Sequence, residues 1–440
     1  MKQVYRPLPL ALAVSLVAVA GCSNQQESDV KESGTSEQAA VVAPTKAQVV
    51  EHYSDLAYAN FSDALTTAEA LDEAVDTLIE NPTEANLAAA KQAWLAARVP
   101  YQQTEVFRFG NAIVDDWEGQ LNAWPLDEGL IDYVAADGYQ YELGNDGATA
   151  NIIASPSINI GGNTVDVSEL TPELLANLNE IGGSEANVAT GYHAVEFLLW
   201  GQDLNGFDAG AGNRPVTDYA QGEECTHGNC DRRAAYLDAA TDLLIDDLEW
   251  MVAQWAPGKD DNYRAELLAE SPDAAIQKML FGMGSLSLGE LAGERMKVAL
   301  EANSYEDEHD CFSDNTHNSH YYNGQGVANV YKGTYTRVDG TVVNGPSLSD
   351  LVAEVNPELD KTLRVQLVES MAALATMKTV AETDNQPLKF DMMIAPSSER
   401  GADIVNGAIV ALVNQTGSIE QAAGELGIDS LEPDDAGHAF

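Results

Sequence analysis

Apolar residues recur at the three- and four-residue spacing of amphipathic helices along most of the chain. This spacing predicts a first helix over about 47–80, which ends at Asn81-Pro82 because proline breaks the helical hydrogen-bond ladder. Thr83 is a typical N-cap, so a second helix is predicted from there to about Gly110. Further helices are predicted over about 171–182, 187–200, 232–255, 272–303, 357–383 and 397–426.

Two short segments carry the turn residues of β-hairpins, around Gly161-Gly162 and around Asp339-Gly340. A polar loop is expected over 306–320. Two long helices, a loop with a hairpin and two more helices occur twice in this order. The pattern predicts an all-α fold of two four-helix-bundle-like halves related by duplication, at 45–228 and 229–440, with small hairpin insertions.

The N-terminus has the pattern of an export signal. Lys2 and Arg6 precede the apolar stretch Leu8–Ala20, which is too short to span a bilayer. Val19-Ala20-Gly21-Cys22 resembles a bacterial lipobox, which implies that residues 1–21 are removed and that Cys22 is lipidated. By resemblance to Gram-negative sorting rules, Ser23 implies an anchor in the outer membrane. The alternative is an ordinary secretory signal with a chance cysteine.

Residues 22–44 are polar and rich in Ser, Gln and Glu, so we expect a disordered tether that spans about 25 Å. The folded part would then lie in the cell envelope, facing the periplasm or the cell surface, and would meet the membrane only through its lipid. Acidic residues outnumber basic ones by 70 to 22, for a net charge of −48. This charge excludes nucleic acid as a partner and attracts cations, although solubility is the simpler explanation for it.

The periplasm permits disulfides, and Cys225 and Cys230 lie close together in a Gly-rich loop. A local disulfide is predicted between them. The alternative, a Cys/His metal clip, has too few ligands in this loop. Cys311 would remain as a free buried thiol or in a different pairing.

His193 and Glu196 are the ionisable side chains of the otherwise apolar run Gly191–Trp200. On a helix, residues three apart share a face, so the imidazole and the carboxylate project together. A buried glutamate needs a partner, and a metal ion shared with His193 would supply one. A buried His–Glu hydrogen bond that holds two helices together is the alternative.

Gly191-Tyr-His-Ala-Val-Glu196 matches the GxHxxE motif of the imelysin family, and the other matching blocks resemble its iron-regulated protein A-like group. The resemblance implies an all-helical cell-envelope protein, linked to iron acquisition, in which the GxHxxE helix faces a cleft between two halves. Some members are described as metallopeptidases, but this chain has no His-Glu-x-x-His. The other blocks are Arg98–Tyr101, Gln103–Gly110, Trp124–Glu128, Glu290–Met296, Glu306–His309 and Phe312–His317.

His193 and Glu196 alone cannot complete a metal site, so we expect Glu105 and Glu290 as further ligands. A histidine with several carboxylates suits iron, with manganese or zinc as alternatives. For each helper the alternative is a salt bridge, such as Glu105 with Arg108. The residues expected to support the ligands are Arg108, Arg295, Asp116, Asp127 and Asp310.

Three histidines, His309, His317 and His320, fall within the predicted polar loop. They form either a second metal-binding patch or part of a solvated loop, and their spacing fits no regular ligand pattern.

Three functions follow, in decreasing order of preference. The first is an iron-binding or iron-uptake lipoprotein without catalytic turnover, whose partners are a metal ion or iron chelate and another envelope iron-uptake protein. The second is a metallopeptidase with His193 and Glu196 as metal ligands. The third is an interaction protein in which that pair is structural.

The lipobox generates a direct test. Replacing Cys22 with Ala should leave an unprocessed precursor or release soluble protein, because the thiol that accepts the lipid is gone. Membrane fractionation and the mass of the mature chain measure this. Normal maturation with unchanged membrane association would show that the lipoprotein assignment is wrong.

Overall fold

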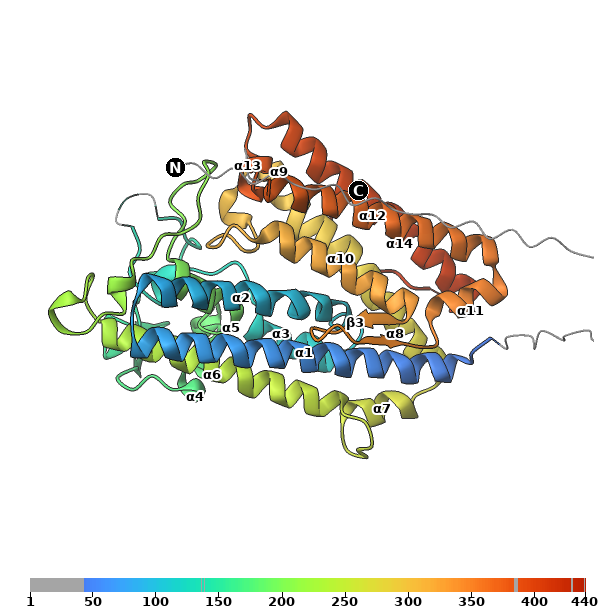
Figure 1. The fold of residues 1–440 in the computed structure, drawn as a ribbon, viewed down its shortest axis with the longest axis horizontal. Coiled ribbons are helices and arrows are strands. Elements are labelled where there is room, and N and C mark those ends of the chain that lie inside the picture. The colour runs from blue at the N-terminus through green and yellow to red at the C-terminus, as the bar shows by residue number, and fades with distance from the viewer. Residues whose placement is uncertain (1–42, 136, 138, 384–386, 429, 439) are drawn as a thin grey trace, which may run out of the picture. The chain divides into compact units, whose positions relative to one another are not determined.

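A computed structural model describes residues 43–440, apart from 136, 138, 384–386, 429 and 439. Helices dominate this part of the chain and only two small sheets accompany them, so the predicted all-α class is confirmed (Figure 1). Within these residues, no helix is both long and apolar enough to cross a bilayer. The signal segment, Cys22 and nearly all of the tether lie outside the described residues.

The first group of helices forms around α1 (Lys46–Glu80), which packs against α2 (Glu84–Thr104) and α6 (Cys230–Trp255) (Figure 1). α5 (Gly191–Trp200) packs against both α2 and α6. Thr45 begins α1 with a capping box, and Thr83 caps α2 as predicted. Smaller helices beside this group are α3 (Ala112–Leu121), α4 (Pro172–Leu178) and α7 (Tyr263–Ala269).

The second group packs around α14 (Glu399–Glu425), which contacts α12 (Pro357–Ala381) and the π-helical stretch η6 (Leu286–Val298). α10 (Thr316–Lys332) packs against α12 and also against α2, so it joins the two groups. α6 begins just after the predicted boundary at 228, yet it packs with the first group. The duplication itself stays a prediction. The remaining helices are α8 (Pro272–Ser285), α9 (Ala299–Ala302), α11 (Leu348–Val355) and α13 (Phe390–Ile394).

Both predicted hairpins are present. β1 (Ser157–Ile160) pairs antiparallel with β2 (Asn163–Asp166), and β3 (Thr334–Thr336) pairs with β4 (Val342–Asn344). Short 3₁₀ turns complete the fold, namely η1 (Glu105–Phe107), η2 (Glu128–Leu130), η3 (Ile181–Gly183), η4 (Val216–Asp218), η5 (Gly222–Glu224) and η7 (Tyr305–Asp307).

The predicted polar loop over 306–320 is wrong from Thr316 onward, where α10 begins. Polar residues suggested solvent exposure, but His317, His320 and Asn323 are buried. α2 ends at Thr104 instead of continuing to Gly110. The predicted helix over 272–303 forms, but its hydrogen bonding becomes π-helical through Leu286–Val298, as is common near functional sites.

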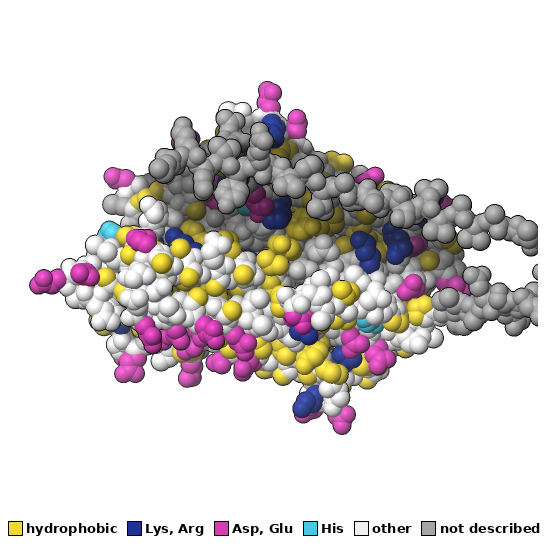
Figure 2. Space-filling model, in the orientation of Figure 1, with side chains coloured by type: hydrophobic (Ala, Val, Ile, Leu, Met, Phe, Trp, Pro, Cys, Tyr) yellow, Lys and Arg dark blue, Asp and Glu magenta, His cyan; other side chains and the backbone are white. Residues whose placement is uncertain are grey.

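Acidic side chains gather along one edge of the molecule in Figure 2, over the region of α1 and α6. Burial raises the pKa of Asp72, and the charges of Asp76 and Asp242 raise it further. The same effects of burial and of the Asp76 charge act on Asp238. Acidic residues on neighbouring turns of the two helices therefore weaken each other's ionisation.

Gly191 sets where α5 begins. Its φ is +79°, and an added Cβ would lie 2.3 Å from the backbone oxygen of Leu121. A side chain there would therefore be strained by the backbone conformation and would also overlap the neighbouring chain. This is why α5 starts at Gly191 and not at 187, and why the motif needs glycine.

We predict that Gly191→Ala lowers the free energy of unfolding by about 2–4 kcal/mol. Gly407→Ala, within α14, is the matched control because its Cβ would meet no atom within 4 Å. That change should be neutral or stabilise the protein by ~0.5–1 kcal/mol. Urea denaturation measures both, and equal stabilities for the two variants would contradict the account of Gly191.

Candidate functional site

α5 is buried along its whole length, from Gly191 to Trp200. Its backbone is fixed by side chains from other elements. The Trp94 indole donates to the Tyr192 carbonyl (2.9 Å), and the Tyr219 hydroxyl donates to the Leu198 carbonyl (2.6 Å). His193 and Glu196 therefore lie inside the protein, with exposed fractions of 1% and 0%.

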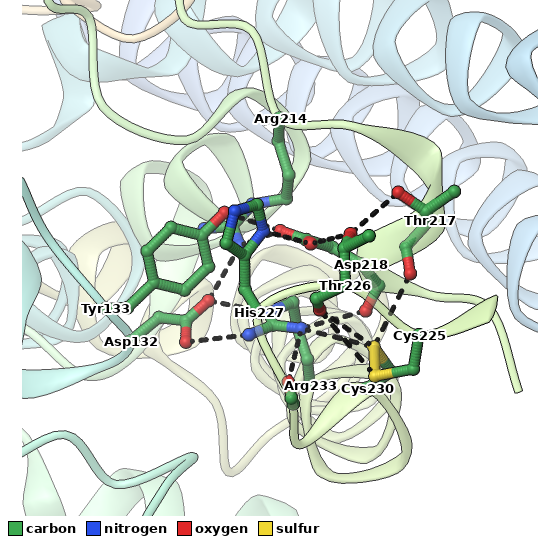
Figure 3. The surroundings of a disulfide bond; sticks show 11 residues. Asp132, Tyr133, Arg214, Thr217, Asp218, Cys225, Thr226, His227, Cys230 and Arg233 are labelled. Atoms are coloured by element: carbon green, nitrogen blue, oxygen red, sulfur yellow. Dashed lines mark hydrogen bonds and ion pairs between the residues drawn. A yellow bond between two sulfur atoms is a disulfide. The ribbon is translucent and has the colours of Figure 1, made fainter. Parts of the chain in front are cut away.

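A polar network around Asp132, Arg214 and Asp218 (Figure 3) contacts the C-terminal end of α5 through Arg214. Arg214 donates to the Phe197 carbonyl (3.4 Å) and to the Asp132 carboxylate (2.7 Å). A cation at this end also interacts favourably with the helix dipole. Asp218 pairs with Arg214 (3.2 Å) and accepts hydrogen bonds from the loop closed by the Cys225–Cys230 disulfide.

The predicted disulfide between Cys225 and Cys230 is therefore present, and its loop supports the residues that fix α5. Within the described part of the chain, Cys311 remains a free thiol. Burial raises the pKa of this thiol well above its usual value, with smaller contributions from Glu196 and other nearby carboxylates. The Cys311 thiol is therefore protonated at neutral pH.

His193 and Glu196 contact each other on one face of α5, as their spacing predicts. The imidazole Nδ1 lies 3.0 Å from Glu196 Oε2. Ser313 donates to the other oxygen, Oε1, from its backbone N–H (2.9 Å) and its hydroxyl (2.6 Å). We assign the ring proton to Nδ1, which leaves the lone pair on Nε2. That buried Nε2 has no partner among the described residues.

The electrostatic surroundings keep the imidazole neutral. Burial lowers the pKa of His193 well below its usual value, and the charges of Arg98 and Arg295 lower it further. Burial and then the Asp310 charge raise the pKa of Glu196 well above its usual value, although Ser313 and Arg98 oppose this. A neutral imidazole is the form that binds metals, and an added cation would stabilise the two crowded carboxylates.

The loop before α10 brings His309 and Asp310 to this pair. Asp310 Oδ1 lies 3.9 Å from His193 Nδ1, and the His309 ring packs edge-on against the His193 ring with centroids 4.7 Å apart. One possible ligand atom from each of these three residues lies within 4.8 Å of the others. Arg98 Nη2 donates to Asp310 Oδ1 (2.9 Å) and lies 3.3 Å from His309 Nε2.

The two expected helpers, Glu105 and Glu290, both lie against the guanidinium of Arg295. Arg295 donates to Glu105 Oε2 (2.7 Å) and to Glu290 Oε1 (2.8 Å). Burial alone would raise the pKa of Glu290, but Arg295 and Arg108 together hold it below its usual value. Their role as metal ligands stays a prediction, and a metal ion there would have to compete with Arg295.

The other residues expected to support the ligands have different surroundings. Asp116 is exposed on α3. Asp127 accepts hydrogen bonds from the Glu142 backbone N–H (3.0 Å) and the Asn145 amide (2.6 Å). Asp310 belongs to the cluster around His193, and Arg295 pairs with both glutamates. Arg108 donates to Asp115 (2.8 Å) and lies 3.7 Å from Glu290.

The three histidines of the predicted loop separate in the structure. His309 faces His193, whereas His317 and His320 lie on α10. All three are buried, so the expectation of a solvated loop is wrong. Sequence reasoning did not assign His309 or Arg98 to the site. Both fall in blocks already matched to the family, which is the signal that could have found them.

Comparisons with known proteins agree with this fold and motif. The imelysin family model, which also carries a peptidase-family label, matches residues 57–419. Iron-regulated protein A of Synechococcus elongatus is 25% identical over 325 residues, covering 72% of this chain and 71% of that protein.

Two solved structures are similar in fold. A candidate iron-regulated protein A precursor from Parabacteroides distasonis has a TM-score of 0.61 and 18% identity, covering 88% of this chain and 97% of that one. An imelysin-like protein from Psychrobacter arcticum has a TM-score of 0.55 and 16% identity, covering 88% and 98%.

We predict that Arg295→Met destabilises the protein by about 3–5 kcal/mol, because it leaves the buried Glu105 without its cation and leaves the partly exposed Glu290 with Arg108 alone, 3.7 Å away. Adding Glu105→Gln should restore part of the loss. Lys361→Met is the control, since the Lys361–Glu358 pair is exposed and 3.9 Å apart and should contribute less than about 0.5 kcal/mol. Guanidinium chloride denaturation compares them, and similar midpoints for both single variants would contradict the prediction.

Proposed function

This chain belongs to the imelysin family, and from that premise we propose that it is a cell-envelope protein that binds iron at His193, His309 and Asp310. Two imidazoles and a carboxylate form a donor set common at non-haem iron sites. Glu196 would orient His193 through Nδ1, as carboxylates commonly do for metal-binding histidines. The protein would take part in iron acquisition without catalytic turnover.

The unpaired imidazole nitrogens support this proposal most directly. His193 Nε2 and His309 Nδ1 are both buried without a hydrogen-bond partner among the described residues. A buried polar atom without a partner is costly, and a metal ion bound at His193 Nε2 would remove that cost for this ring. Burial lowers the pKa of His309 well below its usual value, and the charge of Arg295 lowers it further, so this ring is neutral as well.

Arg98 would compete with the metal ion. Its guanidinium contacts both Asp310 and His309, so binding of a cation has to displace it or share Asp310 with it. An internal competitor lowers affinity and makes binding reversible. Reversible binding suits a protein that takes up iron and passes it on.

An acidic cavity lies next to the proposed site, with Trp124 between them. It has a volume of about 460 Å³. Trp124 lines it and packs against His309 with ring centroids 5.3 Å apart. The carboxylates that line the cavity attract cations. Trp124 separates the cavity from the proposed ligands. The acidic residues that line the cavity are Asp127, Glu142, Glu185, Glu306 and Asp307.

The peptidase alternative is less well supported. A catalytic metal needs a coordination position open to water and substrate, whereas His193 is 1% exposed. The third alternative, an interaction protein with a structural His–Glu pair, would leave the unpaired nitrogens unexplained. The name of the Synechococcus relative, iron-regulated protein A, is consistent with a role connected to iron. Export, the lipid on Cys22 and an envelope partner remain part of the proposal.

We predict that ferrous iron, added anaerobically, raises the melting temperature of the wild-type protein. A ligand at 100 times its Kd contributes about 2.7 kcal/mol to the folded state. His193→Ala and His309→Ala should each abolish the rise, whereas His227→Gln, at a half-exposed histidine, should keep it. Calorimetry with and without iron measures the response of each variant, which separates metal binding from bare stability.

The same experiment distinguishes the alternatives. Glu105→Gln should retain the response if Glu105 serves Arg295 alone, and should lose it if the ligand set expected from the sequence is correct. An equal response in wild type and His193→Ala would overturn the proposal. Cleavage of an unfolded protein that depends on both metal and His193 would favour the peptidase.

A further inference from the structure

A second cluster of buried carboxylates comes from residues on both sides of the His309–Asp310 segment and from α13. Glu308 precedes that segment, Asp314 follows it just before α10, and Asp391 comes from α13. One oxygen from each carboxylate lies within 4.8 Å of the other two. The exposed fractions of these residues are 1%, 4% and 1%. Three acidic groups from separate parts of the chain are thus gathered away from water.

The hydrogen bonding of this cluster is a separate observation that points to a ligand. Glu308 Oε1, Asp314 Oδ1 and Asp391 Oδ1 are all buried without a partner in the described part of the chain. A buried polar oxygen without a partner is costly, and each of these three carboxyl groups has one. A shared cation would satisfy all three at once.

The available protein cation does not fill this role. Lys389 approaches the cluster, but its ammonium donates to the backbone carbonyl of Asp314 (3.1 Å). Asp203 adds a further negative charge, which raises the pKa of both Asp314 and Asp391 beyond the larger effect of burial. The charge of Lys389 opposes this effect and lowers the pKa of both groups.

We propose that Glu308, Asp314 and Asp391 bind a calcium ion. An all-oxygen set of carboxylates suits a hard divalent cation and offers no imidazole or thiolate to a softer metal. The ion would join α13 to the loop that carries His309 and Asp310. This site does not depend on the proposed iron site, because the two share no ligand.

Terbium(III), a luminescent substitute for calcium, provides the test. Trp124 can sensitise it, because the indole Nε1 donates to the Glu308 carbonyl (2.8 Å). We expect one terbium ion per protein, with tryptophan-sensitised emission that calcium displaces. Asp391→Asn and Asp314→Asn should each weaken binding at least tenfold. Asp403→Asn, at an exposed position on α14, should leave it unchanged.

His193→Ala distinguishes this site from the proposed iron site, since it should leave terbium binding intact while abolishing the response to iron. The proposal is overturned if Asp391→Asn and Asp314→Asn, folded by circular dichroism, bind terbium as tightly as wild type, or if His193→Ala removes binding. Should both aspartate variants fail to fold, the wild type decides. Calcium must raise its melting temperature, and the absence of a rise overturns the proposal.

Discussion

The cost of burying charge is the constraint on which this structure depends. Glu196, Asp310, Glu105 and Arg295 are almost completely withdrawn from water. Each such group destabilises the fold unless an opposite charge or hydrogen-bond donor meets it. The chain provides these partners through ion pairs between residues far apart in sequence. The same ion pairs fix the positions of α2, η6 and the loop before α10 relative to one another.

Two arginines perform most of this pairing. Arg98 from α2 reaches Asp310, which lies 212 positions later in the chain. Arg295 from η6 reaches back to Glu105, 190 positions earlier. Both guanidinium groups also lower the pKa of the His193 imidazole. Burial has the larger effect on that pKa, and the two arginines that hold the helical groups together add to it.

The segment from Glu308 to Asp314 contributes residues to both proposed metal sites. Its middle carries His309 and Asp310 toward α5, where unpaired imidazole nitrogens suit a transition metal. Its ends carry two carboxylates toward α13, where only oxygens meet. Ser313, within the same segment, donates to Glu196. The same short segment thus supplies residues to both clusters, which share no ligand.

The sequence by itself determined the helical class, both hairpins, the caps of α1 and α2, and the pairing of His193 with Glu196. All of these depend on neighbours within a few residues, where spacing and turn chemistry fix the geometry. It did not determine which distant groups meet. It did not show, for example, that Glu105 and Glu290 both pair with Arg295. Likewise α10 resembled a loop, because its polar residues face buried partners and not water. Only the tertiary structure determines these partners, because a buried polar side chain pairs with whichever charged or polar group the packing of distant segments places next to it.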